Sequence, residues 1–547
     1  MTPIARRTGS YFGRIPIVAA ARLGLRRVLV KEPDPSTRAP SAVSRSGSRL
    51  RSFVAIGALL ASINVAAQDS RLPTITPPNA EADATVSVLG ELTLIQAVQR
   101  ALSHNFALLA GAQDVLIGAA DVGIARAALL PQLDAAVHGS RIDDDRAIAS
   151  VGRAPEYQSF ASVSLRQRLY SDKALSAYQV QRMLEAARQQ DQEARILDTI
   201  LITAAEYLDL LRAQALLEVD RKNLKVTESN YQRAESRLEL GVGTRSEIYR
   251  WETARANAQS NVVTAQATAS QARITLNRTI SEPLETRYST ETPSIDAPYF
   301  MVSSPEIRAE LARPEARVLL RRYFVEETLR DAPELKAMRQ RLDAQDRRVV
   351  TTKRAFYVPE FSALASLDRE LDRGGDGQEQ IDFSELFPGA LGGVTDKTDW
   401  ALGVEARLPV YQGGARSAER DRARAELDQE QLRYDELVAD LQAGVLKQSL
   451  ATEARFDRIG FSRTAATAGS NNLELVTEAY ERGVMTVTDL VDAQFSAFNA
   501  EQNAANAVYD FLIDYLRLQR YTGHFDIVAS DDERAAMQAR LKAALTQ

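Results

Sequence analysis

Residues 480–493 read YERGVMTVTDLVDA, and residues 238–248 read LELGVGTRSEI. Both stretches contain Gly-Val-x-Thr, and each stands where one long helical pattern ends and another begins. A glycine at the end of a helix supplies the left-handed residue that closes it, and a threonine shortly afterwards is a good cap for the next helix. The repeated turn therefore predicts that the chain is an internal duplication of two long helical hairpins.

The amino-acid composition excludes several classes of functional site. The 547 residues include no cysteine, which excludes disulfides, thiolate metal sites and cysteine catalysis. The three histidines, His104, His138 and His524, are too scattered in the sequence to suggest a metal cluster. No Ser/His/Asp set or carboxylate pair stands in a convincing setting, so a secreted hydrolase is disfavoured. We expect no catalytic residues, no metal and no cofactor.

The first 67 residues differ from the rest in charge. They carry eleven Lys or Arg and two acidic residues, which leaves residues 68–547 with a net charge of −15 and disfavours nucleic acid as a partner. Three arginines precede an apolar run at 53–65 that is too short to span a membrane, and small residues follow it. Residues 1–67 are therefore predicted to be an extended leader and signal peptide, cleaved after Ala67. A small buried helix is the alternative.

The mature chain shows the same order of elements twice. We expect a flexible lead-in at 68–90, a first repeat at 91–280, a connector at 281–322, a second repeat at 323–522 and a charged tail at 523–547. The first repeat is predicted to hold strands 133–141 and 160–169 and helices 174–240 and 246–280. The second is predicted to hold strands 361–368 and 399–408 and helices 415–482 and 487–520. A helix over 174–240 would extend roughly 100 Å, too long for a compact globule.

The four strands alternate apolar and polar residues, as membrane-spanning strands do. An open sheet cannot lie in lipid with unpaired edges, and the smallest closed barrels have about eight strands. If these strands cross a membrane, the barrel must therefore be shared between chains, and three copies of the chain would supply twelve strands. A small soluble sheet at one end of a coiled coil is the other interpretation. The Asp- and Gly-rich loop at 369–398 could bind calcium, although a flexible extracellular loop is favoured.

Several motifs identify a family. The stretches LTLIQAVQRALSHN at 92–105, ARAALLPQL at 125–133 and LPVYQGG at 408–414, with both turns, resemble the TolC-like outer membrane efflux proteins. The resemblance covers residues 90–522. It implies a mainly α fold, in which a homotrimer forms a twelve-stranded β-barrel continuous with a twelve-helix periplasmic α-barrel, with an equatorial region and no catalytic activity.

The resemblance also implies a function and partners. The chain would form a channel in the outer membrane lipid and export drugs or secreted proteins with a periplasmic adaptor and an inner-membrane transporter of the RND or ABC type. The alternative is a periplasmic coiled-coil adaptor or structural protein without a pore. An adaptor would need a lipoyl-like or barrel domain, of which 281–320 gives no sign.

The family's functional positions can be carried over residue by residue. The helical tips that meet the adaptor match Gly241, Val242, Thr244, Gly483, Val484 and Thr486. Asp489 and Asp492 match an acidic ring at the periplasmic entrance; they lie on one helix face, and their alternative roles are a helix cap and a solvated acid. Tyr480 and Glu247 match a hydrogen-bonded tie that holds the entrance closed.

Several positions depart from the family's pattern, among them Met485 and Trp251. Met485 stands where a basic residue often contributes to the closed state, so a tie at that position would not be ionic. Trp251 stands where a small residue is common. Closure of the entrance is therefore expected to be weaker or differently built.

Overall fold

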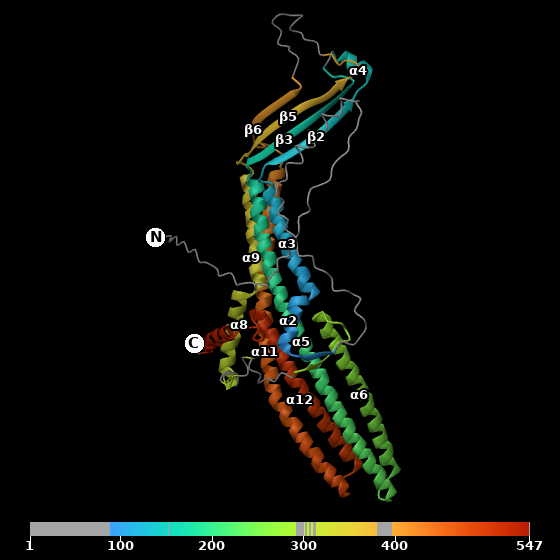
Figure 1. Cartoon of the computed structure of the whole chain (residues 1–547). Helices are drawn as coiled ribbons and strands as arrows, with labels where there is room; N and C mark the ends of the chain where they lie inside the picture. The colour runs from blue at the N-terminus through green and yellow to red at the C-terminus, as the bar shows by residue number, and fades with distance from the viewer. Residues whose placement is uncertain are drawn as a thin grey trace, which may run out of the picture. The chain divides into compact units, whose positions relative to one another are not determined.

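The computed structural model describes residues 88–545, except 151–152, 292–299, 301–303, 306–307, 310–312 and 380–395. The predicted leader, nearly all of the lead-in and the middle of the predicted 369–398 loop lie outside the described residues. Residues 84–547 form one compact unit. The described part of this unit is mainly helical, as the sequence predicts (Figure 1).

The elements follow in the order that Figure 1 shows. The first half contains β1 (Val88–Leu92), α2 (Leu94–His104), α3 (Phe106–Ala127), β2 (Gln132–Arg141), α4 (Asp144–Ala149), β3 (Tyr157–Tyr170), α5 (Asp172–Glu239), α6 (Arg245–Thr279) and β4 (Arg287–Thr290). The second half contains α8 (Pro314–Asp331), α9 (Pro333–Arg354), β5 (Glu360–Gly374), β6 (Thr398–Arg407), α11 (Ala415–Glu481), α12 (Val487–Thr522) and α13 (Asp531–Leu545).

Two long helical hairpins form the body of this unit. Helix α5 turns back into α6, and α11 turns back into α12, while α5 also packs against α9 and α12 (Figure 1). Helix α5 has 68 residues, which corresponds to a length of about 100 Å.

Helix α3 lies along α5 and illustrates how the sequence permits close packing. A Cβ atom at Gly111 would lie 2.4 Å from Gln192 Oε1 and 2.6 Å from Arg195 Nη1, so these two side chains of α5 lie directly against the α3 backbone. Arg195 pairs with Asp114 at 2.7 Å and Arg188 with Asp121 at 2.8 Å, which joins the two helices. Among the described helices, α3 alone is long and apolar enough to cross a membrane by length and composition.

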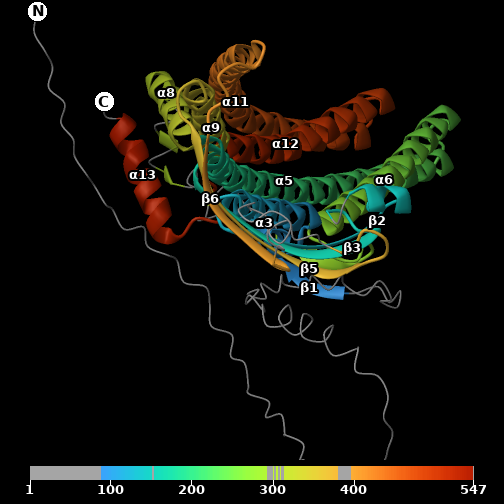
Figure 2. The same cartoon turned by 90° about the horizontal axis from the view of Figure 1, so that it is seen from above.

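The four long strands form one antiparallel sheet in the order β2-β3-β5-β6. Viewed from above, this sheet curves as an arc (Figure 2). Pro131 separates α3 from β2 and Pro359 separates α9 from β5, because proline lacks the amide hydrogen that would continue the helix. Strands β3 and β5 extend beyond the predicted bounds of 160–169 and 361–368, and β5 takes up the start of the loop predicted at 369–398.

A buried ion pair joins the two repeats just below the sheet. Asp172, in the first turn of α5, accepts hydrogen bonds from Arg347 Nη2 at 3.0 Å and Arg354 Nη1 at 2.8 Å, both from α9. The side chains of Asp172 and Arg347 are 7% and 12% exposed. Removing one partner would therefore leave a buried charge without compensation.

The main hydrophobic core lies near the middle of the long helices. Side chains of α2, α5, α6 and α12 meet there, and Tyr207 is fully buried. The Tyr207 hydroxyl donates to the carbonyl oxygens of Leu92, at 2.7 Å, and Glu291, at 2.8 Å, next to the parallel pair of β1 and β4. The sequence did not predict this pair, because each strand is too short to show alternation.

Three further predictions require correction. The second repeat, predicted to start at 323, is preceded by a helix that begins at Pro314, and a second helix begins at Pro333 because proline is favoured in the first turn. The tail predicted at 523–547 contains α13, which packs against α8 through Leu541 and Leu320. Between β2 and β3, where no helix was predicted, lies the short helix α4, capped by the side chain of Asp143.

Candidate functional site

The two turns adopt the same local conformation. Gly241 has φ of +75° and Gly483 has φ of +76°, a region that favours glycine. In each turn the amide of the following valine donates back to a carbonyl of the preceding helix, from Val242 to Arg237 and from Val484 to Ala479. Val242 and Val484 are 64% and 76% exposed. The turns thus present apolar side chains to the outside.

Threonine caps the helix after each turn. The Thr244 hydroxyl accepts from the Glu247 amide at 3.3 Å, and the Thr486 hydroxyl accepts from the Asp489 amide at 3.3 Å. Asp489 also accepts from the amide of Thr486 at 2.8 Å, which completes a capping box. The side-chain and backbone hydrogen bonds from Thr486 lower the pKa of Asp489. Asp489 is thus a helix cap, while Asp492 lies one turn on and is exposed.

We expect Thr486→Ala to loosen the start of α12. The substitution removes the oxygen that accepts from Asp489 and a donor to its carboxylate, so amide exchange in the first turn should quicken by roughly fivefold. Hydrogen-exchange mass spectrometry of 487–493 would measure this, with the exposed Thr467→Ala on α11 as the control. Equal protection in Thr486→Ala and the parent would contradict the capping role.

Tyr480 and Glu247, which the family resemblance pairs, lie together. The Tyr480 hydroxyl donates to Glu247 Oε2 at 3.3 Å, across the gap between the two hairpins. Arg237, from α5, stacks its guanidinium over the Tyr480 ring at 4.9 Å from the centroid. Burial of the ring, and then the negative charge of Glu247, raises the pKa of Tyr480, so that its hydroxyl remains a donor.

An apolar cluster surrounds this contact. Tyr480, Trp251, Ala234 and Leu490 are all buried and come from four different helices. Trp251 is 1% exposed, and its ring fills the space between the hairpins near the turns. The departure from the family at position 251 therefore adds packing between the two halves.

Basic residues of the first hairpin contact the second hairpin near the turns. Arg250 Nη1 donates to the Thr488 hydroxyl at 3.1 Å, and Arg233 pairs with Glu481 at 3.4 Å. Met485 is 42% exposed. The sequence analysis missed Arg233, Arg237 and Arg250 because helical arginines usually face solvent.

A second contact between the hairpins is made of uncharged polar groups. Gln494, on α12, accepts from Asn230 Nδ2 at 2.9 Å. It donates to the Thr227 hydroxyl at 2.6 Å and to Asn223 Oδ1 at 2.9 Å, both on α5. Thr227, Asn230 and Gln494 are buried. We call these four residues the Gln494 cluster; nothing in the sequence distinguishes them from a solvated helix face.

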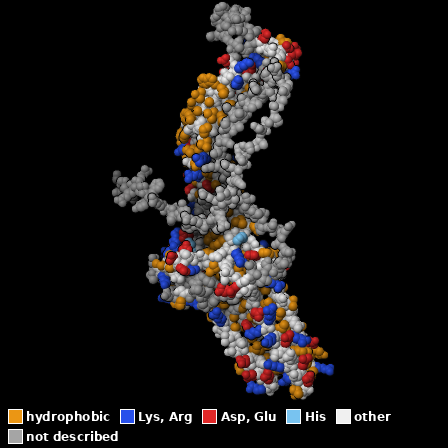
Figure 3. Space-filling model, in the orientation of Figure 1, with side chains coloured by type: hydrophobic (Ala, Val, Ile, Leu, Met, Phe, Trp, Pro, Cys, Tyr) orange, Lys and Arg blue, Asp and Glu red, His pale blue; other side chains and the backbone are white. Residues whose placement is uncertain are grey.

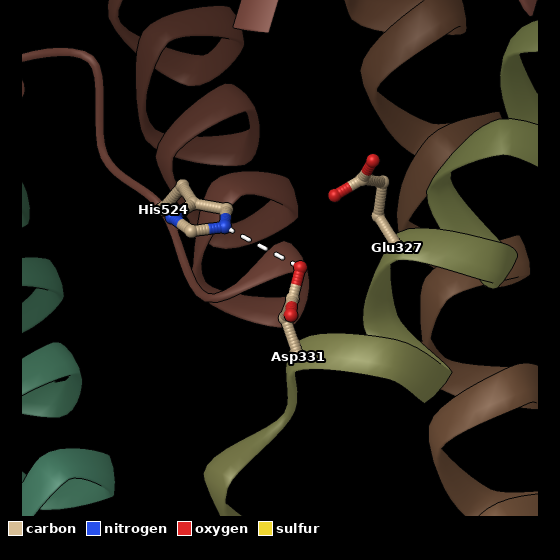
Figure 4. Close-up of side chains that lie close together, drawn as sticks. All are labelled: Glu327, Asp331 and His524. Carbon is tan, nitrogen blue, oxygen red and sulfur yellow. Dashed lines mark ion pairs between the residues drawn. The ribbon is translucent and has the colours of Figure 1, made fainter. Parts of the chain in front are cut away.

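The structure brings one histidine beside two carboxylates. Glu327, Asp331 and His524 lie within reach of a common ion, although the sequence predicted only isolated histidines (Figure 4). Arg330 contacts both carboxylates, and His524 Nε2 lies 3.6 Å from Asp331. Burial would raise the pKa of Asp331, but the hydrogen bond and charge of Arg330 outweigh it and lower that pKa. The charge that would attract a metal is therefore already compensated.

Comparisons with known proteins place this arrangement in a family. The chain matches the family described as outer membrane efflux protein over residues 97–281 and 324–524. It is 22% identical over 435 residues to the outer membrane efflux protein BepC of Brucella suis, covering 79% of this chain and 85% of that protein. It is also 22% identical over 450 residues to the alkaline protease secretion protein AprF of Pseudomonas aeruginosa, covering 80% of this chain and 85% of that protein.

Solved structures share the fold. The Campylobacter jejuni CmeC outer membrane channel matches with a TM-score of 0.61 at 17% identity, over 82% of this chain and 89% of that one. The open state of the Neisseria gonorrhoeae MtrE outer membrane channel matches with a TM-score of 0.59 at 20% identity, over 79% and 88%. The resemblance inferred from the sequence is confirmed, and the chain belongs to the outer membrane efflux protein family.

Proposed function

We propose that three copies of this chain form an outer membrane channel that exports small molecules or secreted proteins. In this proposal the four-stranded sheets of three chains close into a twelve-stranded barrel, and the long helices continue it as a periplasmic tunnel. Energy would come from an inner-membrane transporter of the RND or ABC type, reached through a periplasmic adaptor. The chain itself would carry out no catalysis.

The observation that carries this proposal is the arrangement of side chains on the sheet. Cross-strand pairing aligns Leu133, Leu165, Ala365 and Leu402 in one row and Ala135, Val163, Leu367 and Trp400 in the next row of the same face. Trp400 and Leu402 are 75% and 76% exposed, and apolar side chains gather over the strands (Figure 3). An exposed apolar face of this kind fits lipid.

The opposite face of the same strands is polar. One row across the strands consists of Asp134, Ser164 and Ser366. Another row consists of Ser162, Asp368 and Asp399. Strands β2 and β6 are the edges of the sheet, and lipid cannot satisfy the free backbone groups of an edge. Pairing of β2 with β6 of the next chain would satisfy both edges and enclose a polar lumen. This supports a shared barrel.

The turns support the proposed contact with an adaptor. Exposed Leu240, Val242 and Val484 surround the two glycines and offer apolar area to helical tips of a partner. The curated relatives differ in their named roles, efflux for BepC and alkaline protease secretion for AprF. Both cargo classes therefore remain within the proposal.

Single-channel current in a planar lipid bilayer tests this function. Detergent-extracted protein should give discrete, cation-selective steps that added multivalent cations suppress. A protein that extracts without detergent and gives no steps would overturn the channel and favour a periplasmic coiled-coil adaptor or structural protein.

The proposed acidic ring predicts a selectivity change. In a trimer, Asp489 and Asp492 would place six carboxylates around the entrance, so Asp489→Ala with Asp492→Ala should reduce cation selectivity and block by divalent ions. Reversal potentials in asymmetric salt would measure this. The control removes two exposed acids, Glu436 and Asp440, about 65–70 Å along α11 from its turn. Equal selectivity in both double variants would contradict the assignment of Asp489 and Asp492 to an acidic ring at the entrance.

A further inference from the structure

The polar face of the four-stranded sheet is hollowed near the helical end of the strands. The hollow is open to solvent and has a volume of about 640 Å³, within the roughly 300–1,000 Å³ typical of sites for drug-sized molecules. Most of the residues that line it belong to the polar face by strand alternation. They include Gln132, Asp134, Ser164, Arg166 and Ser366. All of them come from one chain, so the hollow needs no second copy to form.

Two opposite charges stand in this hollow. Arg166 lies directly across from Gln132, and Asp134 lies across from Ser164, so Arg166 and Asp134 are diagonal neighbours on adjacent strands. Diagonal neighbours on one face have backbones about 7–8 Å apart. Both residues are exposed, and neither side chain makes a hydrogen bond or an ion pair within the part of the chain that the structure describes. A ligand can therefore reach both charges.

The surroundings of the two charges are of mixed character. Ser164 and Ser366 lie in the same row as Asp134, and their hydroxyls can donate or accept hydrogen bonds. Leu364 adds apolar surface to the otherwise polar face. Arg168 also lines the hollow, but its Nη1 donates at 2.6 Å to a backbone carbonyl at the end of α3. The hollow thus offers one untied positive group, one negative group, hydroxyls and an apolar contact.

A ligand with a single charge would gain little from this arrangement. An anion beside Arg166 would also lie near the carboxylate of Asp134, and a cation beside Asp134 would lie near the guanidinium of Arg166. A molecule with both charges meets a partner for each. The guanidinium presents paired donors to a carboxylate, and the aspartate accepts from an ammonium group.

We infer that this hollow binds a zwitterionic, drug-sized molecule in transit, with Arg166 bound to its carboxylate and Asp134 bound to its ammonium group. The inference rests on the proposed channel, because the polar face would line the lumen, and it names a class of cargo for that channel. Three chains would place three such sites around the lumen. Exposed ion pairs are weak, so binding is brief, as a site that cargo must leave requires.

Single-channel recording in a planar bilayer tests the inference with two penicillins. Ampicillin carries an ammonium group and a carboxylate at about pH 6, and benzylpenicillin has the same ring system and carboxylate without the ammonium group. We expect ampicillin to interrupt the open current at roughly three- to fivefold lower concentration. Asp134→Asn should weaken block by ampicillin by that factor and leave block by benzylpenicillin no weaker, whereas Arg166→Gln should weaken both.

Two variants outside the hollow serve as matched controls. Asp368→Asn and Arg407→Gln remove the same charges from exposed positions of the same face that do not line the hollow. Neither should change the preference for ampicillin. Equal block by the two penicillins, or an effect of Asp134→Asn no larger than that of Asp368→Asn, would overturn the inference and leave only a general field in the lumen.

Binding to the detergent-extracted protein separates this inference from the channel, because the hollow is complete in one chain. Saturation-transfer difference NMR should show stronger binding of ampicillin than of benzylpenicillin, with the same dependence on Asp134 and Arg166. This result without channel steps would support the site and overturn the channel. Channel steps without any preference for ampicillin in either measurement would support the channel and overturn the site.

Discussion

Alanine in place of Tyr480 is expected to raise the single-channel conductance of the assembled protein severalfold. The substitution removes a buried ring that contacts Arg237 on α5 and the hydroxyl that donates to Glu247 on α6. It also opens the apolar cluster with Trp251 and Leu490. The second hairpin would then separate from the first near the turns. Planar bilayer recordings at constant salt measure the change.

The chain provides a matched control for this result. Tyr434, also on α11, lies near Arg339 of α9 with the guanidinium 5.8 Å from its ring, and Arg339 donates to its hydroxyl at 3.1 Å. Tyr434→Ala therefore removes a similar contact within the second repeat, and conductance should not change. Tyr480→Phe keeps the ring and should have a small effect. Equal conductance in Tyr480→Ala and Tyr434→Ala would contradict a closing role for Tyr480.

Alanine in place of Asp172 is expected to destabilise the protein by about 3–5 kcal/mol, because it leaves Arg347 buried without its carboxylate. The midpoint of thermal unfolding, followed by circular dichroism, should fall accordingly. Asp191 supplies the control, since it pairs with Arg341 between the same two helices, but their side chains are 34% and 41% exposed. Asp191→Ala should cost no more than about 1 kcal/mol. Equal losses in both variants would show that burial does not govern these pairs.

The contribution of Asp172 should depend on pH in one direction. Burial alone would raise the pKa of Asp172, but hydrogen bonds from Arg347 and Arg354 outweigh it and lower that pKa. Asp172 therefore binds its proton less tightly in the folded protein than in the unfolded chain, where this carboxyl titrates at about pH 4. The stabilisation is complete above that pH and is lost as pH falls through the lowered pKa. The difference between the parent and Asp172→Ala should thus be constant from about pH 5 to 8 and shrink in acid.

The parts of this fold that the sequence predicted are those determined by nearby residues. The turns at Gly241 and Gly483 follow from a glycine with positive φ and a threonine cap, which lie within a few positions of each other. The sheet follows from alternation along each strand. These features need no knowledge of what packs against them.

The parts that sequence reasoning missed depend on contacts between distant segments. Arg237 meets Tyr480, and Gln494 meets Asn230, only because the two hairpins lie side by side. A single sequence gives no sign of such pairs, because each of these residues alone is typical of a solvated helix face. The family resemblance supplied Tyr480 with Glu247 but could not supply Arg250 or the filling role of Trp251.

The Gln494 cluster is a part of the attachment between the hairpins that dissolved salt should not weaken. Dissolved ions screen exposed pairs such as Lys222 with Glu501, whose side chains are 64% and 41% exposed. Amide and hydroxyl groups carry no net charge to screen, and Thr227, Asn230 and Gln494 are buried away from ions. A proteoliposome moved from dilute to concentrated salt should therefore lose its surface pairs while α5 and α12 keep their alignment.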